Sequence, residues 1–331
     1  MLLVSNYLND FFSLLNLIIL IVPVLLSVAL LTLLERKVLG FIQFRKGPNL
    51  VGPYGILQPF SDGLKLFVKE NFSPSSSSTF LYFFSPILFL FISLFLWGVI
   101  PLYKSGLNFC LSLLFIITIS SLSVYGILGA GWSSNSKYSL LGSVRAVAQV
   151  ISYEVSFGLI LIPLVILVGG WGLSSFLSFQ SLGVWIFFPC FPLFLMWYIS
   201  SLAETNRTPF DLSEGESELV SGYNVEYSGA PFAFFFIGEY ANIIFINIIS
   251  VLLFFGPICF FSGNIFWIIF FLILKSLFFI FSFLWVRSSF PRVRYDQLMM
   301  IMWKNFLPLS ISFLIFYFFM IFFIYSFPSY Y

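Results

Sequence analysis

Histidine is absent from this sequence of 331 residues, and Asp, Glu, Lys and Arg together make up only 8% of it. Without imidazole, the chain lacks the usual haem ligand and the usual proton carrier near neutral pH. We therefore expect any electron-transfer cofactor to belong to another chain and any proton chemistry to depend on carboxylates. So few charges also exclude the charged surface that a soluble domain needs.

Cysteine is scarce as well, and each of the three cysteines lies alone inside an apolar run: Cys110, Cys190 and Cys259. Isolated cysteines predict neither a disulfide framework nor a metal site. We expect three buried, inert thiols. No run of basic residues indicates nucleic-acid binding.

Apolar residues are abundant instead, at 60% of the chain, and aromatic residues alone reach 22%. A helix needs about 20 residues to cross the hydrocarbon core of a membrane. We therefore predict an all-α integral membrane protein with one polytopic domain over residues 1–331. Its eight predicted spans are 11–34, 80–102, 107–130, 139–168, 184–203, 230–256, 264–286 and 306–326.

Basic residues gather on one side of this predicted arrangement. Only Lys104 lies on the side of the two termini. Inner loops of membrane proteins carry the excess of Lys and Arg, so we expect the other side to face the cytoplasm of a bacterium or the matrix of a mitochondrion. The loops on that side contain Arg36, Lys37, Arg45, Lys46, Lys65, Lys69, Lys137, Arg207, Arg287, Arg292, Arg294 and Lys304.

The first inner loop contains a second, weaker helical pattern. Asp62 and Lys65 lie on a different side of this predicted helix from its apolar residues. The pattern predicts an amphipathic helix on the inner membrane surface, although a solvated connector is the simpler alternative. The apolar positions are Ile56, Leu57, Phe60, Leu64 and Phe67.

Four charged residues lie inside predicted spans: Arg145, Glu154, Glu239 and Lys275. A charge in the middle of a membrane costs about 2.5–3.5 kcal/mol on insertion scales, so such residues usually have a function. Arg145 and Glu154 are nine residues apart on one helix and face opposite ways, so each needs a partner on another helix. We expect Lys275 to approach the carboxylates from the outer side, or to act as a structural counter-ion to one of them.

Three carboxylates form a series in depth. At about 1.5 Å per residue, Glu204 lies at the inner rim, Glu239 about 14 Å deep and Glu154 about 22 Å deep. Buried carboxylates can hold protons at intermediate affinity. We interpret the three as a proton relay; the alternative is that they only hold helices together.

The segment between Ala203 and Gly229 contains six of the thirteen acidic residues of the chain. Asp211 or Ser213 can cap a short helix there. Glu214 and Glu218 would then repel each other by a few tenths of a kcal/mol. Bound cations, basic partner chains or a water-filled cavity would have to compensate. We interpret this short helical acidic loop, between spans 5 and 6, as a functional mouth rather than a solubilising segment.

Four long segments together resemble one family, subunit 1 of NADH:ubiquinone oxidoreductase (respiratory complex I), over about residues 22–310. The form of the third segment is similar to the mitochondrial branch. The segments are "LLERKVLGFIQFRKGPNLVGPYGILQPFSDGLKLFVKE", "GWSSNSKYSLLGSVRAVAQVISYEVS", "SLAETNRTPFDLSEGESELVSGYNVEYSG" and "VRSSFPRVRYDQLMMIMWKNFLPLS".

The resemblance implies a subunit of the mitochondrial inner membrane, at the junction of the membrane and hydrophilic arms, with its long loops in the matrix and both termini in the intermembrane space. Ubiquinone would be the substrate. No cofactor would be bound by this chain alone, because NADH, FMN and the iron–sulfur clusters belong to partner subunits. The expected partners are two hydrophilic subunits that complete the quinone site, the adjacent small membrane subunits, and membrane lipids, with no nucleic acid.

The resemblance also implies roles for individual residues, by motif match. Glu154, Glu204 and Glu239 match the carboxylate channel of the family, and Phe236 matches the tunnel wall. The remaining matches are Glu35 and Arg36 beside the tunnel, Asp62 and Lys65 on the surface helix, Arg207, Asp211, Glu214, Glu216 and Glu218 in the acidic loop, and Arg287, Arg292 and Arg294 in the last inner loop.

The leading hypothesis is thus a subunit without a redox centre that belongs to a proton-translocating NADH:ubiquinone reductase. It would line the quinone tunnel and couple quinone reduction to proton translocation. One alternative is a stand-alone cation/proton transporter, but such proteins usually show internal repeats and matched broken helices, and this sequence shows neither. The other alternative, a structural anchor, leaves the deep Glu154 and Glu239 without a reason.

Overall fold

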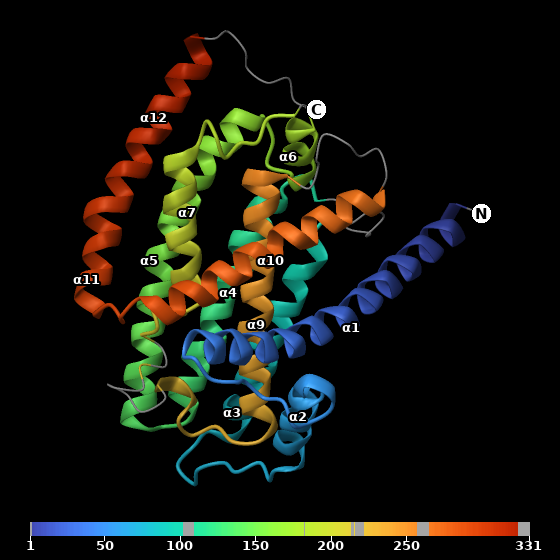
Figure 1. The fold of residues 1–331 in the computed structure, drawn as a ribbon, viewed down its shortest axis with the longest axis vertical. Coiled ribbons are helices and arrows are strands. Elements are labelled where there is room, and N and C mark those ends of the chain that lie inside the picture. Colours follow the sequence, from blue (N-terminus) through green and yellow to red (C-terminus); the bar gives the residue numbers. More distant parts are fainter. Residues whose placement is uncertain are drawn as a thin grey trace.

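The computed structural model describes residues 2–101, 109–181, 183–212, 215, 222–256 and 265–323, with the side chains of 2–18, 265 and 321 excepted. Every regular element in these ranges is helical, as predicted (Figure 1). The α-helices are α1 (Leu2–Ile42), α2 (Gln58–Val68), α3 (Thr79–Leu96), α4 (Ser112–Ser133), α5 (Lys137–Val168), α6 (Leu173–Gln180), α7 (Phe191–Glu204), α9 (Ala230–Ser250), α10 (Ile265–Ser289), α11 (Tyr295–Met300) and α12 (Leu307–Phe323). Shorter helical pieces are η1 (Pro53–Gly55), η2 (Trp97–Val99), η3 (Gly222–Asn224), and the π-helical η4 (Val251–Phe255) and η5 (Ile301–Phe306).

Seven stretches among the described residues are long and apolar enough to cross a membrane. They correspond in order to seven of the eight predicted spans. Their bounds are Ile19–Ile42, Thr79–Val99, Ser112–Ser133, Lys137–Val168, Ala230–Phe255, Phe266–Ser289 and Tyr295–Met320.

The remaining predicted span, 184–203, contains α7, which has only 14 residues. At 1.5 Å per residue, α7 is about 21 Å long, less than the thickness of the hydrocarbon core. Residues 186–190 before it form turns, and Pro192 occupies the first turn of α7, a position that suits proline. An eighth span therefore stays a prediction.

Helix α1 is longer than its predicted span. It continues through Glu35, Arg36 and Lys37 to Ile42, so the "ERK" motif is helical rather than part of a loop. The sequence has no glycine or proline between Pro23 and Gly40 to interrupt it. As a result, the side chains of Glu35 and Arg36 point to different sides of one helix.

The centre of the molecule is formed by α3, α4, α5 and α9. Helix α3 packs against α4 and α9, and α4 packs against α5. Helices α7 and α12 contact α5, whereas α1, α2 and α10 contact α9. Figure 1 shows α1 and α10 running obliquely across this central group. The contacts of α9 with α1 and α10 are the ones that position the candidate site.

Two glycines bring the central helices close together around the ring of Phe89 on α3. A Cβ added at Gly238 on α9 would lie 2.8 Å from that ring, and one added at Gly126 on α4 would lie 3.0 Å from Cβ of Phe89. Small residues allow this kind of close packing between membrane helices. Helix α9, which carries Glu239, is held against α3 in this way.

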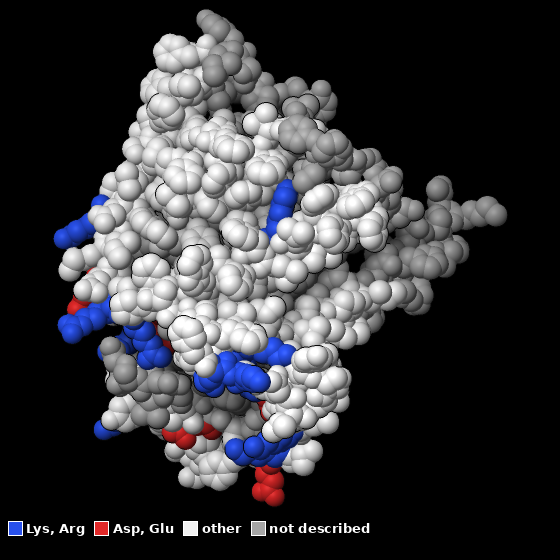
Figure 2. All heavy atoms as spheres, viewed as in Figure 1, with Lys and Arg blue, Asp and Glu red and all other residues white. Residues whose placement is uncertain are grey.

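Charged side chains are unevenly distributed over the molecule. In the view of Figure 2, Lys and Arg gather towards the lower part, around α2, the C-terminal end of α1 and the segment near α11. The upper part of this face is almost uncharged. Such a separation is typical of a chain that crosses a membrane, with the basic end towards the inner side. Which compartment that end faces stays a prediction.

The cysteine prediction was correct for one residue and wrong for another. Cys190 is buried at the start of α7, whereas Cys110 is exposed. Cys110 precedes the first turn of α4 instead of facing a neighbouring helix, which explains its exposure. Cys259 lies outside the described residues.

Candidate functional site

Glu35 on α1 is the centre of a buried ionic cluster. Its side chain accepts a hydrogen bond from the hydroxyl of Tyr240 on α9, with 2.8 Å between the oxygens. It also pairs with Arg207, at 3.4 Å, and with Arg287 on α10. Glu35 is only 4% exposed, and a buried carboxylate is tolerated only when it is paired and hydrogen-bonded. We call Glu35, Arg207, Tyr240 and Arg287 the Glu35 cluster.

Arg207 occupies the middle of this cluster. Its guanidinium carbon lies 4.5 Å from the centre of the Tyr240 ring, the geometry of a cation–π contact. The same tyrosine thus binds Glu35 through its hydroxyl and Arg207 through its ring. The cluster combines two arginines with one carboxylate, so it favours an approaching negative charge.

A second, exposed ion pair lies next to this cluster. Arg36 on α1 binds Asp62 on α2 with 2.6 Å between Nη1 and Oδ2, and both side chains are substantially exposed. Gln58 donates a further hydrogen bond to Asp62 at 2.9 Å. This pair connects α1 to α2 but is accessible to water, so its contribution to stability is small.

The last inner loop is attached to the start of the acidic segment. Arg292 lies 3.4 Å from the carboxylate of Asp211, which is 9% exposed. The main-chain N–H of Val293 donates to the carbonyl of Pro209 at 2.9 Å. Two predicted site residues, Asp211 and Arg292, therefore meet. Arg294, two residues further on, is exposed, and so is Lys65 on α2.

A large apolar cleft lies between α1, α9 and α10. Its volume is about 870 Å³, within the range of ligand-binding pockets. Leu31 and Ile280 line both this cleft and a smaller cavity formed by Glu35, Arg207 and Arg287. The apolar cleft therefore ends at the Glu35 cluster. Other lining residues include Pro23, Val24, Ser27, Ile248, Ser276 and Leu277.

A polar cavity of about 40 Å³ lies deeper in the helix group. Nine of its lining residues are apolar, and the polar ones are Ser120, Ser123, Glu204, Thr205, Asn206, Glu239 and Asn242. The oxygens Glu204 Oε2, Asn206 Oδ1 and Asn242 Oδ1 are buried without a hydrogen-bond partner among the described residues. Polar cavities of this size hold water, which satisfies such groups.

Glu204 is the last residue of α7, which is not one of the seven candidate spans. Burial, together with a smaller effect of the nearby charge of Glu154, raises the pKa of its carboxyl to about 8. Glu204 therefore holds a proton near neutral pH. Glu154 on α5 lies within hydrogen-bonding reach of Ser121 on α4. Glu154 and Glu204 are thus neighbours.

Glu239 on α9 connects the polar cavity to the Glu35 cluster. It accepts a hydrogen bond of 2.5 Å from the hydroxyl of Tyr223. The charges of Arg207, a member of the Glu35 cluster, and of Asp211 act on it. Glu35, Arg207 and Glu239 are thus electrostatic neighbours in turn, Glu239 shares the polar cavity with Glu204, and Glu204 is influenced by the charge of Glu154.

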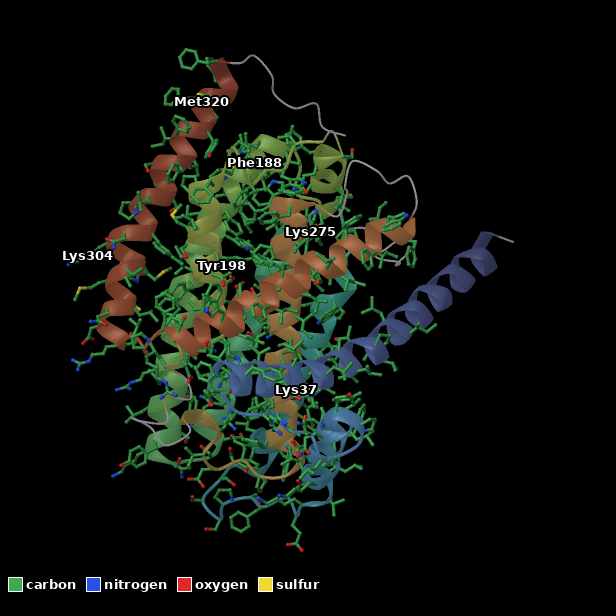
Figure 3. All side chains as sticks on the ribbon, viewed as in Figure 1. Lys37, Phe188, Tyr198, Lys275, Lys304 and Met320 are labelled. Atoms are coloured by element: carbon green, nitrogen blue, oxygen red, sulfur yellow. The ribbon has the colours of Figure 1, made fainter. Side chains whose placement is uncertain are left out.

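Lys275 lies apart from these carboxylates. Its ammonium donates to the carbonyls of Phe255, at 3.0 Å, and Gly256, at 2.7 Å, and lies 4.9 Å from the centre of the Trp185 ring. Phe255 is sixteen residues after Glu239, or about 24 Å along the helix. The contacts shown for Lys275 thus place it at the end of α9–η4 remote from Glu239 (Figure 3), where a cation stabilises the helix terminus.

The structure places the remaining predicted residues as follows. Phe236 is half-buried, and the centroid of its ring lies 4.5 Å from that of Phe232. It lines neither the apolar cleft nor the smaller cavity at the end of that cleft. Arg145 is half-buried on α5. Glu214, Glu216 and Glu218 lie outside the described residues, and so does the predicted helix of the acidic loop.

Sequence reasoning missed Tyr223, Tyr240, Asn206 and Asn242. A signal for three of them was present. Tyr240 follows Glu239 directly, Asn242 lies one helical turn after Glu239, and Asn206 lies between Glu204 and Arg207. Asn242 lies on the same side of the helix as Glu239, because residues three apart on a helix are neighbours. Tyr240 and Asn206 only adjoin charged residues in the sequence. Tyr223 lies three residues before Glu226, which is not a predicted site residue, and sixteen before Glu239.

Comparison with known proteins identifies the family. The model of the NADH dehydrogenase family matches residues 15–318. Chain 1 of NADH-ubiquinone oxidoreductase from Patiria pectinifera is 60% identical over 306 residues, which cover 91% of this chain and 92% of the relative. The proteins of the same name from Paracentrotus lividus and Carassius auratus are 57% and 56% identical over 305 and 295 residues, covering 91% and 89% of this chain and 93% and 90% of theirs. The resemblance of the four sequence segments is thereby confirmed, and the chain belongs to the NADH dehydrogenase family.

Proposed function

We propose that this chain is the membrane subunit of proton-pumping NADH:ubiquinone oxidoreductase that receives ubiquinone from the membrane and relays protons in response to its reduction. The observation that carries this proposal is the continuity of the site. The apolar cleft borders the Glu35 cluster, and the charge of Arg207 in that cluster acts on Glu239. A hydrophobic substrate and a series of carboxylates meet at one point.

The cleft suits a quinone with a long apolar tail. Its lining is mostly aliphatic, as the isoprenoid tail requires, while the cavity at its end presents the guanidinium groups of Arg207 and Arg287. These groups donate hydrogen bonds to the carbonyl oxygens of a quinone ring. Reduction to the quinol consumes two electrons and two protons. The electrons come from an iron–sulfur cluster on a hydrophilic partner, and this chain contributes binding and charge.

Coupling follows from competition for Arg207. A reduced quinone that still lacks its protons carries negative charge and attracts the guanidinium away from Glu239. A carboxylate that loses a neighbouring cation gains affinity for a proton. Glu239 then takes up a proton and later passes it through the water of the polar cavity to Glu204 and on to Glu154. Proton movement along this series would be driven by the charge state of the quinone.

The surroundings of the site agree with a place in a larger complex in the mitochondrial inner membrane. The apolar residues of α2 are exposed, among them Leu64 at 67% and Val68 at 82%. We propose that α2 lies on the inner membrane surface and that residues 184–203 form an eighth span, with Glu204 just beyond its inner end. The long loops would face the matrix and both termini the intermembrane space. Two hydrophilic subunits would close the quinone site from the matrix side.

The cleft can be tested by filling it. Leu277 on α10 lines the cleft, whereas Leu274, one turn earlier and equally exposed, does not. In the assembled complex, Leu277→Trp should raise KM for long-tailed ubiquinone at least ten-fold and have less effect with a short-tailed analogue. Leu274→Trp is the matched control and should leave both values within two-fold. Equal effects of the two substitutions would show that the quinone does not use this cleft.

A further inference from the structure

Tyr223 makes one of the shortest contacts in the polar interior. It belongs to η3, the short helical turn before α9, and its side chain is fully buried. Its hydroxyl donates to Glu239 Oε1 at 2.5 Å. The mechanism above uses Glu239 but gives no part to this tyrosine.

The phenol of Tyr223 is held in place by two helices. A Cβ added at Gly142 on α5 would lie 2.9 Å from the Cα of Gly222 and 3.0 Å from the N of Tyr223. Only a glycine at position 142 lets η3 touch the backbone of α5. On its other side, the ring of Tyr223 meets the ring of Phe235 on α9 edge to face, with centroids 5.3 Å apart. The hydroxyl therefore has a fixed direction towards Glu239.

A hydroxyl that donates to a carboxylate stabilises the ionised form, because charge-assisted hydrogen bonds are stronger than neutral ones. The bond also fixes the carboxyl group, since Oε1 is held and Oε2 remains as the oxygen that exchanges a proton. The other charged groups near Glu239 are Arg207 and Asp211, and Glu204 shares the cavity. Of these neighbours, the tyrosine is the neutral donor in direct contact.

We propose that Tyr223 is a positioning residue that prepares Glu239 to release its proton into the polar cavity. Glu204 first gives its own proton to Glu154. The proton of Glu239 then passes to a water molecule in the cavity and on to Glu204, so Glu239 becomes a carboxylate and Glu204 is again a carboxylic acid. This inference rests on the proposed relay role of Glu239. It also assigns a function to the packing of η3 on α5, because that packing determines where the hydroxyl lies.

Tyr227 provides a matched control. It lies four residues after Tyr223 and is also buried, at 6% exposed. Its hydroxyl contacts the hydroxyls of Ser85, at 3.2 Å, and Ser133, at 3.1 Å. Its ring stacks on Tyr82 with centroids 4.3 Å apart. Tyr227 thus helps to hold the same segment in place, and these contacts are all with neutral groups.

The test compares Tyr223→Phe with Tyr227→Phe in the assembled complex in liposomes. Tyr223→Phe should lower the number of protons pumped per quinone reduced while quinone reduction without a proton gradient stays within two-fold. The rate of proton release should fall about ten-fold, the change that loss of a hydrogen bond to a charged group produces. Tyr227→Phe should leave both pumping and the carboxyl bands unchanged. Wild-type pumping with Tyr223→Phe would overturn the proposal.

Infrared difference spectra separate this proposal from the relay itself. Glu239→Gln identifies the carboxyl band of Glu239, and Tyr223→Phe should shift that band. If Glu239→Gln pumps normally but the shift is present, the relay role fails and the contact stands. If the Tyr223→Phe complex does not assemble, the contact is tested from its other side, through the tyrosine band of the Glu239→Gln complex. Glu239→Gln should shift the C–O band of a tyrosine, and an unchanged tyrosine band would refute the contact.

Discussion

Two buried carboxylates of this chain, Glu35 and Glu204, are held in opposite ways. Glu35 is surrounded by cations and donors, because Arg207, Arg287 and the hydroxyl of Tyr240 all contact it. Glu204, in contrast, has another carboxylate, Glu154, as its charged neighbour. Neutral amides and hydroxyls, together with apolar side chains, line the remainder of its cavity. These surroundings favour a permanent charge on Glu35, and they support the proposed exchange of a proton at Glu204.

The largest effect should come from removing the charge of Glu35. Glu35→Ala would leave Arg207 and Arg287 largely buried without their carboxylate, which typically costs about 3–5 kcal/mol. We expect little assembled complex and a lower midpoint of thermal inactivation. Asp62→Asn removes an exposed ion pair instead and should cost less than about 1 kcal/mol. Equal losses from the two changes would contradict the description of Glu35 as a buried, fixed charge.

Changing Glu154, the charged neighbour of Glu204, should have a smaller effect on stability but a large effect on the coupling of quinone reduction to proton pumping. Glu154→Gln keeps the shape of the side chain and removes its proton exchange. The complex should assemble and reduce quinone in uncoupled membranes, while proton pumping falls at least ten-fold. Glu70→Gln, at an exposed position, is the control and should pump normally. Wild-type pumping by an assembled Glu154→Gln complex would show that Glu154 takes no part in a proton relay and only helps to hold the helices together.

The smallest effect is a pH dependence that belongs to Glu204. Burial raises its pKa to about 8, well above the value near 4.3 of an unfolded chain. Between these values the folded state binds more protons than the unfolded state, so stability falls as pH rises. The contribution is about 1.4 kcal/mol per pH unit around pH 6–7. Glu204→Gln should flatten this slope in thermal inactivation measured from pH 6 to 8; an unchanged slope would show that Glu204 ionises normally.

Much of the fold was predictable because helix formation in a membrane is a local property. Seven apolar runs became helices in the predicted order, since a run of apolar residues has few other ways to satisfy its backbone. The 41-residue length of α1 was not predicted. Charged residues such as Arg36 and Lys37 are compatible with a helix, and nothing in a hydropathy pattern shows that the helix continues through them.

The site was predictable in its members but not in its contacts. Counted depths place Glu239 between Glu204 and Glu154, whereas by contact Glu204 is the middle member. Depth along a helix says nothing about which helices are neighbours. The same limit explains the Glu35 cluster, whose members Glu35 and Arg207 are separated by 172 positions in the chain. Their meeting depends on how α1 and the segment after α7 approach α9, where Tyr240 contacts both residues.

The continuity of α1 has a further consequence for how distances are set at this site. Leu20 in the cleft and Glu35 in the cluster belong to one uninterrupted helix, so about 22 Å along the axis separates them. The length of α1 therefore fixes the distance between the apolar cleft and the Glu35 cluster. On the quinone path proposed above, the distance from the apolar cleft to the charged end is set by about four helical turns and not by the shape of a loop. An insertion of one residue between Leu20 and Glu35 would rotate the Glu35 side chain by about 100° around the helix axis, away from its partners in the cluster.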